Sequence, residues 1–174
     1  MTDEASTGES SNRSTVLLIA ALGSVLVVAY AALAAVQILV LNPLAAAPDR
    51  TLAQIHSDLA SAGESLGESY TLGILGLGCG LALLLLVLLG RNAAATPRGT
   101  AVAYAIMLMF GAPAYFIASF GAGMGLADAY GIGGADHSPW SRLLYAASVL
   151  AMVAAVVLAV SGIRRPRRSE PVTR

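Results

Sequence analysis

Four long apolar stretches, none of which contains Asp, Glu, Lys or Arg, dominate the hydropathy pattern of the chain. They are Val16–Leu41, Leu72–Leu89, Ala101–Phe120 and Leu143–Ile163. A helix of about 20 apolar residues crosses a 30 Å hydrocarbon core, so each stretch predicts a transmembrane helix. With their flanking residues included, the predicted spans are about 16–41, 70–90, 100–121 and 141–163. Short connections make neighbouring helices antiparallel, and residues 15–163 are therefore predicted to form an all-α membrane domain, an up-down bundle of four transmembrane helices.

A short amphipathic segment lies between the first two spans, beyond Asn42-Pro43, where we expect the first helix to end. Thr51 and Gln54 have the spacing of a capping box, and Gly67 suits the position just past a helix end. We therefore predict a helix over about 51–66 on the outer face, the side that carries few arginines. At 100° per residue its apolar side chains fall within about 80° of arc. They are Leu52, Ile55, Leu59, Ala62 and Leu66.

The polar face of this predicted helix decides what its apolar face contacts. Helices that lie in lipid headgroups usually carry Lys or Arg on the polar face and aromatic residues on the other. This segment instead carries acids, with Arg50 only at its start and no aromatic residue before Tyr70. We expect the apolar face to pack on protein, either on the outer ends of its own bundle near the loop 122–139 or on a partner, and we favour its own bundle.

Small residues suggest where the predicted spans pack closely. In the second span Gly73, Gly76 and Gly80 share one face, and Gly121 and Gly125 repeat the spacing at the end of the third. Such stripes let helix backbones approach in lipid. We expect them to pack inside the bundle, with a dimer contact as the alternative. The third span also contains Gly111-Ala-Pro113, which predicts a kink that can create a cavity.

The composition supports a membrane protein, and the arginines predict its orientation. The chain is 57% hydrophobic and only 11% charged, against about 25% charged residues in a soluble domain. It contains ten arginines and no lysine; with both termini in the cytoplasm, eight arginines lie inside and two, Arg50 and Arg142, outside. Basic residues in short loops favour the cytoplasmic side. The proposed topology anchors are Arg91, Arg98, Arg164, Arg165, Arg167 and Arg168.

Two polar tails flank the predicted domain. Residues 1–14 have the composition of a disordered cytoplasmic tail, and residues 164–174 form a basic cytoplasmic tail. We interpret the basic tail as a topology anchor against lipid headgroups. No aromatic residue is interleaved with its arginines for stacking on bases, so we expect no nucleic acid partner.

Candidate chemistry is sparse along the sequence. No ionisable residue falls within the four apolar cores, which argues against a proton-coupled transporter or an ion channel. A metal site could be built from His56 and His137 with Asp128 and Asp136, but no carboxylate lies three or four residues from His56. We expect no catalytic residues, no metal site and no cofactor, and hence a protein that is not an enzyme.

The stretch "AALAAVQILVLNPLAAAPDRTLAQI", together with the Ala/Gly/Arg-rich and lysine-free composition, resembles small four-span integral membrane proteins of high-GC Gram-positive bacteria. This resemblance implies a multi-pass protein of the plasma membrane and no particular activity. Our leading hypothesis is a non-enzymatic accessory or scaffold subunit in the lipid bilayer that recognises a membrane-protein partner, or a second copy of itself, through its outer loops. The alternative is a transport component or a small-molecule sensor with a cavity near the third-helix kink.

Overall fold

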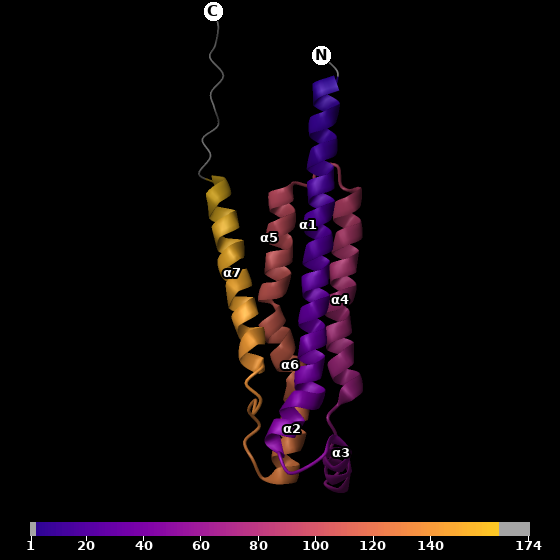
Figure 1. Ribbon diagram of the computed structural model, residues 1–174, viewed down its shortest axis with the longest axis vertical. Coiled ribbons are helices and arrows are strands. Elements are labelled where there is room, and N and C mark those ends of the chain that lie inside the picture. Colours follow the sequence, from indigo (N-terminus) through magenta and orange to yellow (C-terminus); the bar gives the residue numbers. More distant parts are fainter. Residues whose placement is uncertain (1–2, 164–174) are drawn as a thin grey trace, which may run out of the picture.

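The computed structural model describes residues 3–163 and is built of helices connected by short loops. Four of its helical segments are long and apolar enough to cross a membrane: Asn12–Ala46, Glu68–Arg91, Pro97–Tyr130 and Ser141–Gly162. The start of α1 (Asp3–Val36) and the end of α7 (Ser141–Ile163) lie at one end of the molecule, and α3 (Leu52–Ser61) lies at the other (Figure 1). The predicted all-α fold with four spans and a short helix between the first two is confirmed.

The first span is longer than predicted at both ends. Its helix α1 begins at Asp3, so the backbone from there to residue 14 is helical where the sequence suggests a disordered tail. Extending an existing helix costs far less than starting a new one, and the long apolar helix supplies the nucleus. At the other end, the helix continues through a π-helical turn, η1 (Gln37–Leu41), into α2 (Asn42–Ala46).

Pro43 therefore does not end the first helix, contrary to the prediction. The backbone N–H of Asn42 donates to the carbonyl of Gln37, five residues earlier, in the wider turn of a π-helix. This turn relieves the clash between a proline ring and the carbonyl four residues before it. Pro43 then occupies the first turn of α2, where a missing N–H is tolerated.

The third span also runs past its predicted end at residue 121. It is broken at Phe110 into α5 (Pro97–Met109) and α6 (Gly111–Tyr130), and Gly131, with a φ of 64°, ends α6. The break lies just before Pro113, which has no N–H to donate to the carbonyl of Met109. The first half of the predicted loop 122–139 is thus helical, and the segment 131–140 is an irregular connection.

The helices differ in length, and two of the candidate spans are longer than a bilayer core requires. At 1.5 Å per residue, the 22 residues of Ser141–Gly162 measure about 33 Å, close to the thickness of the hydrocarbon core. The segments Asn12–Ala46 and Pro97–Tyr130 contain 35 and 34 residues and measure about 50 Å. They extend about 20 Å past the start of α7 and, with α3, form what we call the headpiece, residues 38–69 and 118–139 (Figure 1).

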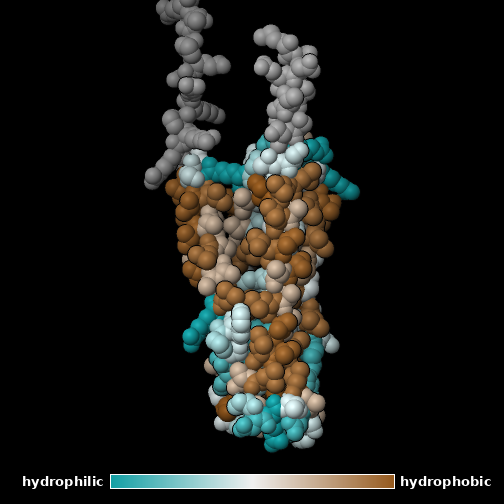
Figure 2. All heavy atoms as spheres, in the orientation of Figure 1, coloured by the Kyte–Doolittle hydropathy of each residue, from teal (hydrophilic) through white to brown (hydrophobic). Residues whose placement is uncertain are grey.

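Surface hydropathy agrees with this division. Figure 2 shows apolar residues along the spans and over part of the headpiece, with polar residues gathered at the tip of the headpiece. The aromatic side chain of Trp140, next to the first residue of α7, is 52% exposed. Tryptophan is enriched at membrane interfaces, so its position is consistent with a bilayer boundary at the base of the headpiece.

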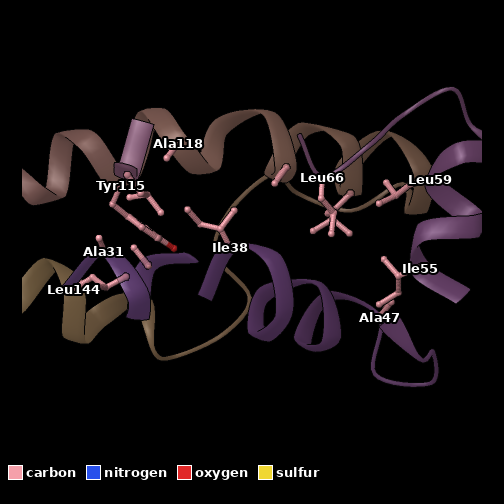
Figure 3. Close-up of a cluster of buried hydrophobic side chains, with 13 residues drawn as sticks. Ala31, Ile38, Ala47, Ile55, Leu59, Leu66, Tyr115, Ala118 and Leu144 are labelled. Atoms are coloured by element: carbon pink, nitrogen blue, oxygen red, sulfur yellow. The ribbon is translucent and has the colours of Figure 1, made fainter. Parts of the chain in front are cut away.

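The largest buried side chains gather in the headpiece and at its base. They form one apolar cluster, which includes Ile38, Ile55, Leu59, Leu66, Tyr115, Leu126 and Leu144 (Figure 3). A second, smaller cluster fills the other half of the bundle, where α1 packs on α4 (Glu68–Arg91) and α5. It consists of Ala20, Val27, Ala82 and Tyr104. Two alanines let the helices approach closely in this half, and the ring of Tyr104 fills the space between them.

The glycine stripe of α4 faces outward and does not pack inside the bundle. Gly73, Gly76 and Gly80 are exposed, and a methyl group built on any of them would meet no atom within 4 Å. Gly121 is equally open. Equal spacing in the sequence does not reveal which face of a helix turns inward, and α4 directs Leu75 and Ala82 toward the core instead.

Different glycines make the close backbone contacts. A methyl group on Gly125 would lie 2.9 Å from the carbonyl oxygen of Ser65, and one on Gly123 would lie 2.9 Å from that of Gly134. In the other half of the bundle, the ring of Tyr104 lies directly against Gly23. Of the five glycines singled out in the sequence, only Gly125 therefore makes a close backbone contact, at the place where α6 meets the segment around Ser65.

Candidate functional site

The predicted outer helix begins as expected and ends earlier. The hydroxyl of Thr51 accepts from the backbone N–H of Gln54 at 3.3 Å, and the Gln54 side chain accepts from the backbone N–H of Thr51 at 2.9 Å, which completes a capping box. At the other end, Gly63 and Glu64 donate to the carbonyls of Ala60 and Leu59. This is a Schellman motif, and Gly63, with a φ of 77°, takes the left-handed position that we assigned to Gly67.

The apolar face of α3 packs on the bundle of its own chain. Ile55 and Leu59 are at most 1% exposed, and so is Leu66, although it lies beyond the helix. All three belong to the cluster that contains Leu126 of α6. Leu52 is half-buried, and Ala62, the C-cap residue, is exposed because the helix has already ended there. The apolar face of α3 is thus covered by other parts of the same chain.

Polar contacts fix the headpiece around this core. The hydroxyl of Tyr130 donates to Asp58 at 2.9 Å, and Arg50 lies 3.6 Å from the same carboxylate. His56 lies 3.1 Å from Glu68 across the turn between α3 and α4. These contacts join α3 to the end of α6 and to the start of α4.

The two histidines considered as metal ligands have separate structural contacts. The backbone N–H of His137 donates to Oδ1 of Asn42 at 2.7 Å, and its ring Nε2 lies 3.0 Å from the carbonyl of Gly133. His56 Nδ1 lies 2.8 Å from the carbonyl of Leu52. Within residues 3–163, no group of three or more His, Cys, Asp and Glu side chains is placed to hold a metal ion.

A polar pair connects the base of the headpiece with the loop 131–140. Tyr115 is fully buried, and its hydroxyl donates to Oδ1 of the exposed Asp136 at 2.6 Å. Its ring meets that of Tyr145 edge to face, with centroids 5.5 Å apart. Asp136 is thereby held against the start of α7, with one carboxylate oxygen engaged by a strong hydrogen bond.

Gln37 is the least satisfied polar residue in the described part of the chain. It lies in the π-helical turn and is fully buried. Its amide lies near the hydroxyl of Tyr115, but neither amide atom makes a hydrogen bond of good geometry. Leaving a buried polar group unpaired costs about 1–3 kcal/mol. π-helical turns frequently occur at functional sites. Asn42, at the end of the same turn, is also buried but accepts from the backbone N–H groups of His137 and Ser138.

A pocket of about 240 Å³ opens beside Asp136. Four elements form it: α2, α6, the loop 131–140 and the start of α7. Its walls are Asn42, Phe116, Ser119, Phe120, Gly123, Gly134, Ala135, Asp136 and Tyr145. It therefore combines one carboxylate with three aromatic rings at the level where the headpiece meets the bilayer. We call it the Asp136 pocket.

A larger groove lies at the break in the third span, where the sequence suggests a cavity. It measures about 490 Å³ and is lined almost entirely by apolar side chains of α1, α4, α5 and α6, among them Val27, Leu75, Met107 and Ile117. The hydroxyl of Ser148 donates to the carbonyl of Leu108 at 2.9 Å. Ser148 of α7 thus supplies a hydrogen bond to a backbone carbonyl next to the break between α5 and α6.

The arginines proposed as topology anchors lie at the end opposite the headpiece, as far as the structure describes them. Arg91 ends α4 and is exposed, and Arg98 reaches α7, where it donates to the hydroxyl of Ser161 at 3.1 Å. Arg164, Arg165, Arg167 and Arg168 lie outside the described residues, as does the basic tail. The two described anchors and both ends of the described chain share one end of the bundle (Figure 1).

Sequence reasoning missed the cluster at the base of the headpiece. In the sequence, Asp136 was considered only as a metal ligand, and no role was assigned to Tyr115. Gln37 offered a usable signal, because it is the only amide side chain in the apolar stretch Val16–Leu41. No protein-family model matches the chain, and no curated protein or solved structure matches it either. The geometry of the site therefore carries the functional argument.

Proposed function

We propose that the protein is a non-enzymatic subunit of the plasma membrane that recognises a partner through its headpiece. The observation that carries this proposal is that two candidate spans are about 20 Å longer than the fourth, and that this additional length forms a packed unit with α3. A helix of about 20 residues suffices to anchor a chain in lipid. The additional length supports a surface outside the membrane.

The charge of the headpiece indicates the kind of partner. Residues 38–69 and 118–139 contain six carboxylates and one arginine. Of these acids, Asp49, Asp128 and Asp136 are exposed. The arginine bias of the sequence supports an orientation with this face outside the cell. Complementary charge steers association and selects partners, so an acidic headpiece fits a basic outer surface on another membrane protein.

Co-purification tests this proposal. The protein is extracted in mild detergent, and its retained partner is identified by mass spectrometry. Because the partner is expected to contact exposed acids, Asp49→Lys combined with Asp128→Lys should reduce its recovery at least tenfold. Ala93→Lys, a charge change at an exposed position of the opposite end, is the matched control and should leave recovery unchanged. Equal recovery with the headpiece and control variants would contradict recognition by the headpiece.

The groove at Phe110 supports a second candidate function, that of a small-molecule sensor. Its apolar walls and volume of about 490 Å³ suit a hydrophobic ligand that arrives through the bilayer. Ala114→Trp would fill the groove from α6. If signalling through the groove is the function, this substitution should abolish the cellular response while the headpiece variants leave it intact.

A further inference from the structure

We propose that the Asp136 pocket binds a quaternary ammonium group at the membrane interface. Aromatic rings attract organic cations through their negative faces, and rings that surround quaternary ammonium ligands are a recurrent arrangement in proteins. The pocket contributes Phe116, Phe120 and Tyr145 to such a site. Asp136 adds a full negative charge to the same walls.

The carboxylate is positioned for a ligand. Tyr115 donates to Oδ1 of Asp136 at 2.6 Å from a fully buried position, and this hydrogen bond sets the orientation of the carboxylate on an otherwise irregular loop. Tyr115 is the hydrogen-bond partner of this carboxylate within the described residues. The other oxygen remains available to a cation in the pocket. A quaternary ammonium group offers no N–H donors, so it would be held by charge and by the rings.

The surroundings of the pocket favour an amphiphile. Phe116 and Phe120 lie on the outer surface of α6, 57% and 58% exposed, with ring centroids 6.1 Å apart. Trp140 and the start of α7 place them at the bilayer boundary. An ammonium headgroup at Asp136 could therefore leave its hydrocarbon chain in the adjacent leaflet, along these two rings. Lipid headgroups and free solutes both supply this chemistry, and the test separates the two sources.

Other ligand classes fit the pocket less well. An anion would be repelled by Asp136, since no cationic side chain lines the walls. A divalent metal ion requires several oxygen ligands, whereas Asp136 is the only carboxylate among the lining residues. The mixture of one carboxylate and three rings is best matched by a large, weakly hydrated monovalent cation.

Isothermal titration of the purified full-length protein in neutral detergent tests the proposal with two probes. Choline and 3,3-dimethylbutanol have nearly the same shape, but only choline is charged. Choline should bind at least tenfold more tightly, and its binding should weaken with added salt because Asp136 is exposed. Equal binding of the two probes would overturn the proposal, because it would show a merely apolar pocket.

Three variants locate the binding. Asp136→Asn retains a carbonyl oxygen for Tyr115 and removes the charge, and it should weaken choline binding at least tenfold. Phe120→Leu retains apolar volume and removes a ring, and it should weaken binding by about two- to fivefold. Asp128→Asn, at an exposed acid elsewhere on α6, is the matched control and should bind as the unmodified protein does. If Asp136→Asn shows an unchanged melting temperature and unchanged choline affinity, the assignment is wrong.

Dodecyltrimethylammonium distinguishes the source of the headgroup. If the natural ligand is a membrane amphiphile, this probe should bind at least tenfold more tightly than choline, and Phe116→Ser should remove most of the difference. If choline binds as tightly as the amphiphile, the site selects a soluble ammonium compound, and the ammonium assignment stands while its membrane origin is excluded.

Discussion

At the scale of single residues, close backbone approach depends on which glycines face another segment. Gly23 lies against the ring of Tyr104, whose hydroxyl contacts Ser24 at 2.9 Å and donates to the carbonyl of Ala82 at 3.0 Å. Both contacts fix the hydroxyl end of the side chain, so the ring could move aside only by breaking them. Gly76, which has the more conspicuous spacing in the sequence, meets nothing within 4 Å. Spacing alone could not distinguish the two.

Gly23→Leu should lower the stability of the protein by about 1–3 kcal/mol, because the added side chain would displace a fixed ring. Gly76→Leu, on the exposed face of α4, should change stability by less than about 0.5 kcal/mol. Thermal unfolding in detergent compares the two variants directly. Similar destabilisation by both would mean that the stripe on α4 is covered by a second molecule under the conditions of the measurement.

Gln37 offers an unusual opportunity to stabilise the protein by a single substitution. Gln37→Met keeps nearly the same shape and removes two unpaired polar groups, so it should raise the free energy of unfolding by about 1–3 kcal/mol. Asn42→Leu should have the opposite effect, because it removes the acceptor of the His137 and Ser138 N–H groups. Chemical unfolding monitored by circular dichroism would measure both. A loss of stability in Gln37→Met would show that the amide has a partner in solution.

At the scale of elements, hydrophobic periodicity predicted the helices well and their ends less well. The capping box at Thr51 and the apolar face of α3 follow directly from local spacing. The ends of the first and third spans do not follow from local spacing. A π-helical turn accommodates Pro43 in the first, and buried glycines allow α6 to continue beneath the segment around Ser65 in the third. These depend on long-range contacts. The Asp136 pocket depends on them as well, because it joins residues from four elements.

Leu59→Asp should destabilise the headpiece by about 2–5 kcal/mol, since it replaces a side chain that is 1% exposed and packs between α3 and α6. Ser57→Asp, on the exposed face of the same helix, is the control and should have little effect. Hydrogen exchange should show faster exchange in α3 and at the end of α6, with the membrane-embedded parts of α4 and α7 still protected. Uniformly faster exchange along all helices would instead indicate that the headpiece and the spans unfold as one unit.

At the scale of the whole molecule, the bundle has one arginine-rich end and one acidic end. Arg91 and Arg98 lie at the end where the described chain begins and finishes, and six carboxylates lie in the headpiece. The positive-inside rule then predicts that the headpiece faces outward. This separation of charge could be predicted from the sequence, because it requires only the number and order of the spans.

Single-cysteine labelling tests the orientation in intact cells. In a Cys79→Ser background, Ser57→Cys in the headpiece should react with a membrane-impermeant maleimide, and Ala93→Cys between α4 and α5 should react only after lysis. Both positions are exposed in the structure, so access to the reagent depends on the side of the membrane. The reverse pattern of labelling would place the headpiece in the cytoplasm and would exclude an extracellular partner.

The contact between the segment around Ser65 and Gly125 also has a consequence for the order of biosynthesis. These two residues are sixty positions apart. At 5–20 residues per second, the ribosome needs roughly 3–12 s to make the intervening chain. During this interval α3 has already emerged, but the helix that covers Ile55 and Leu59 does not yet exist. The apolar face of α3 in the nascent protein must therefore be shielded from water for seconds, either by lipid or by a chaperone, before the third span is synthesised.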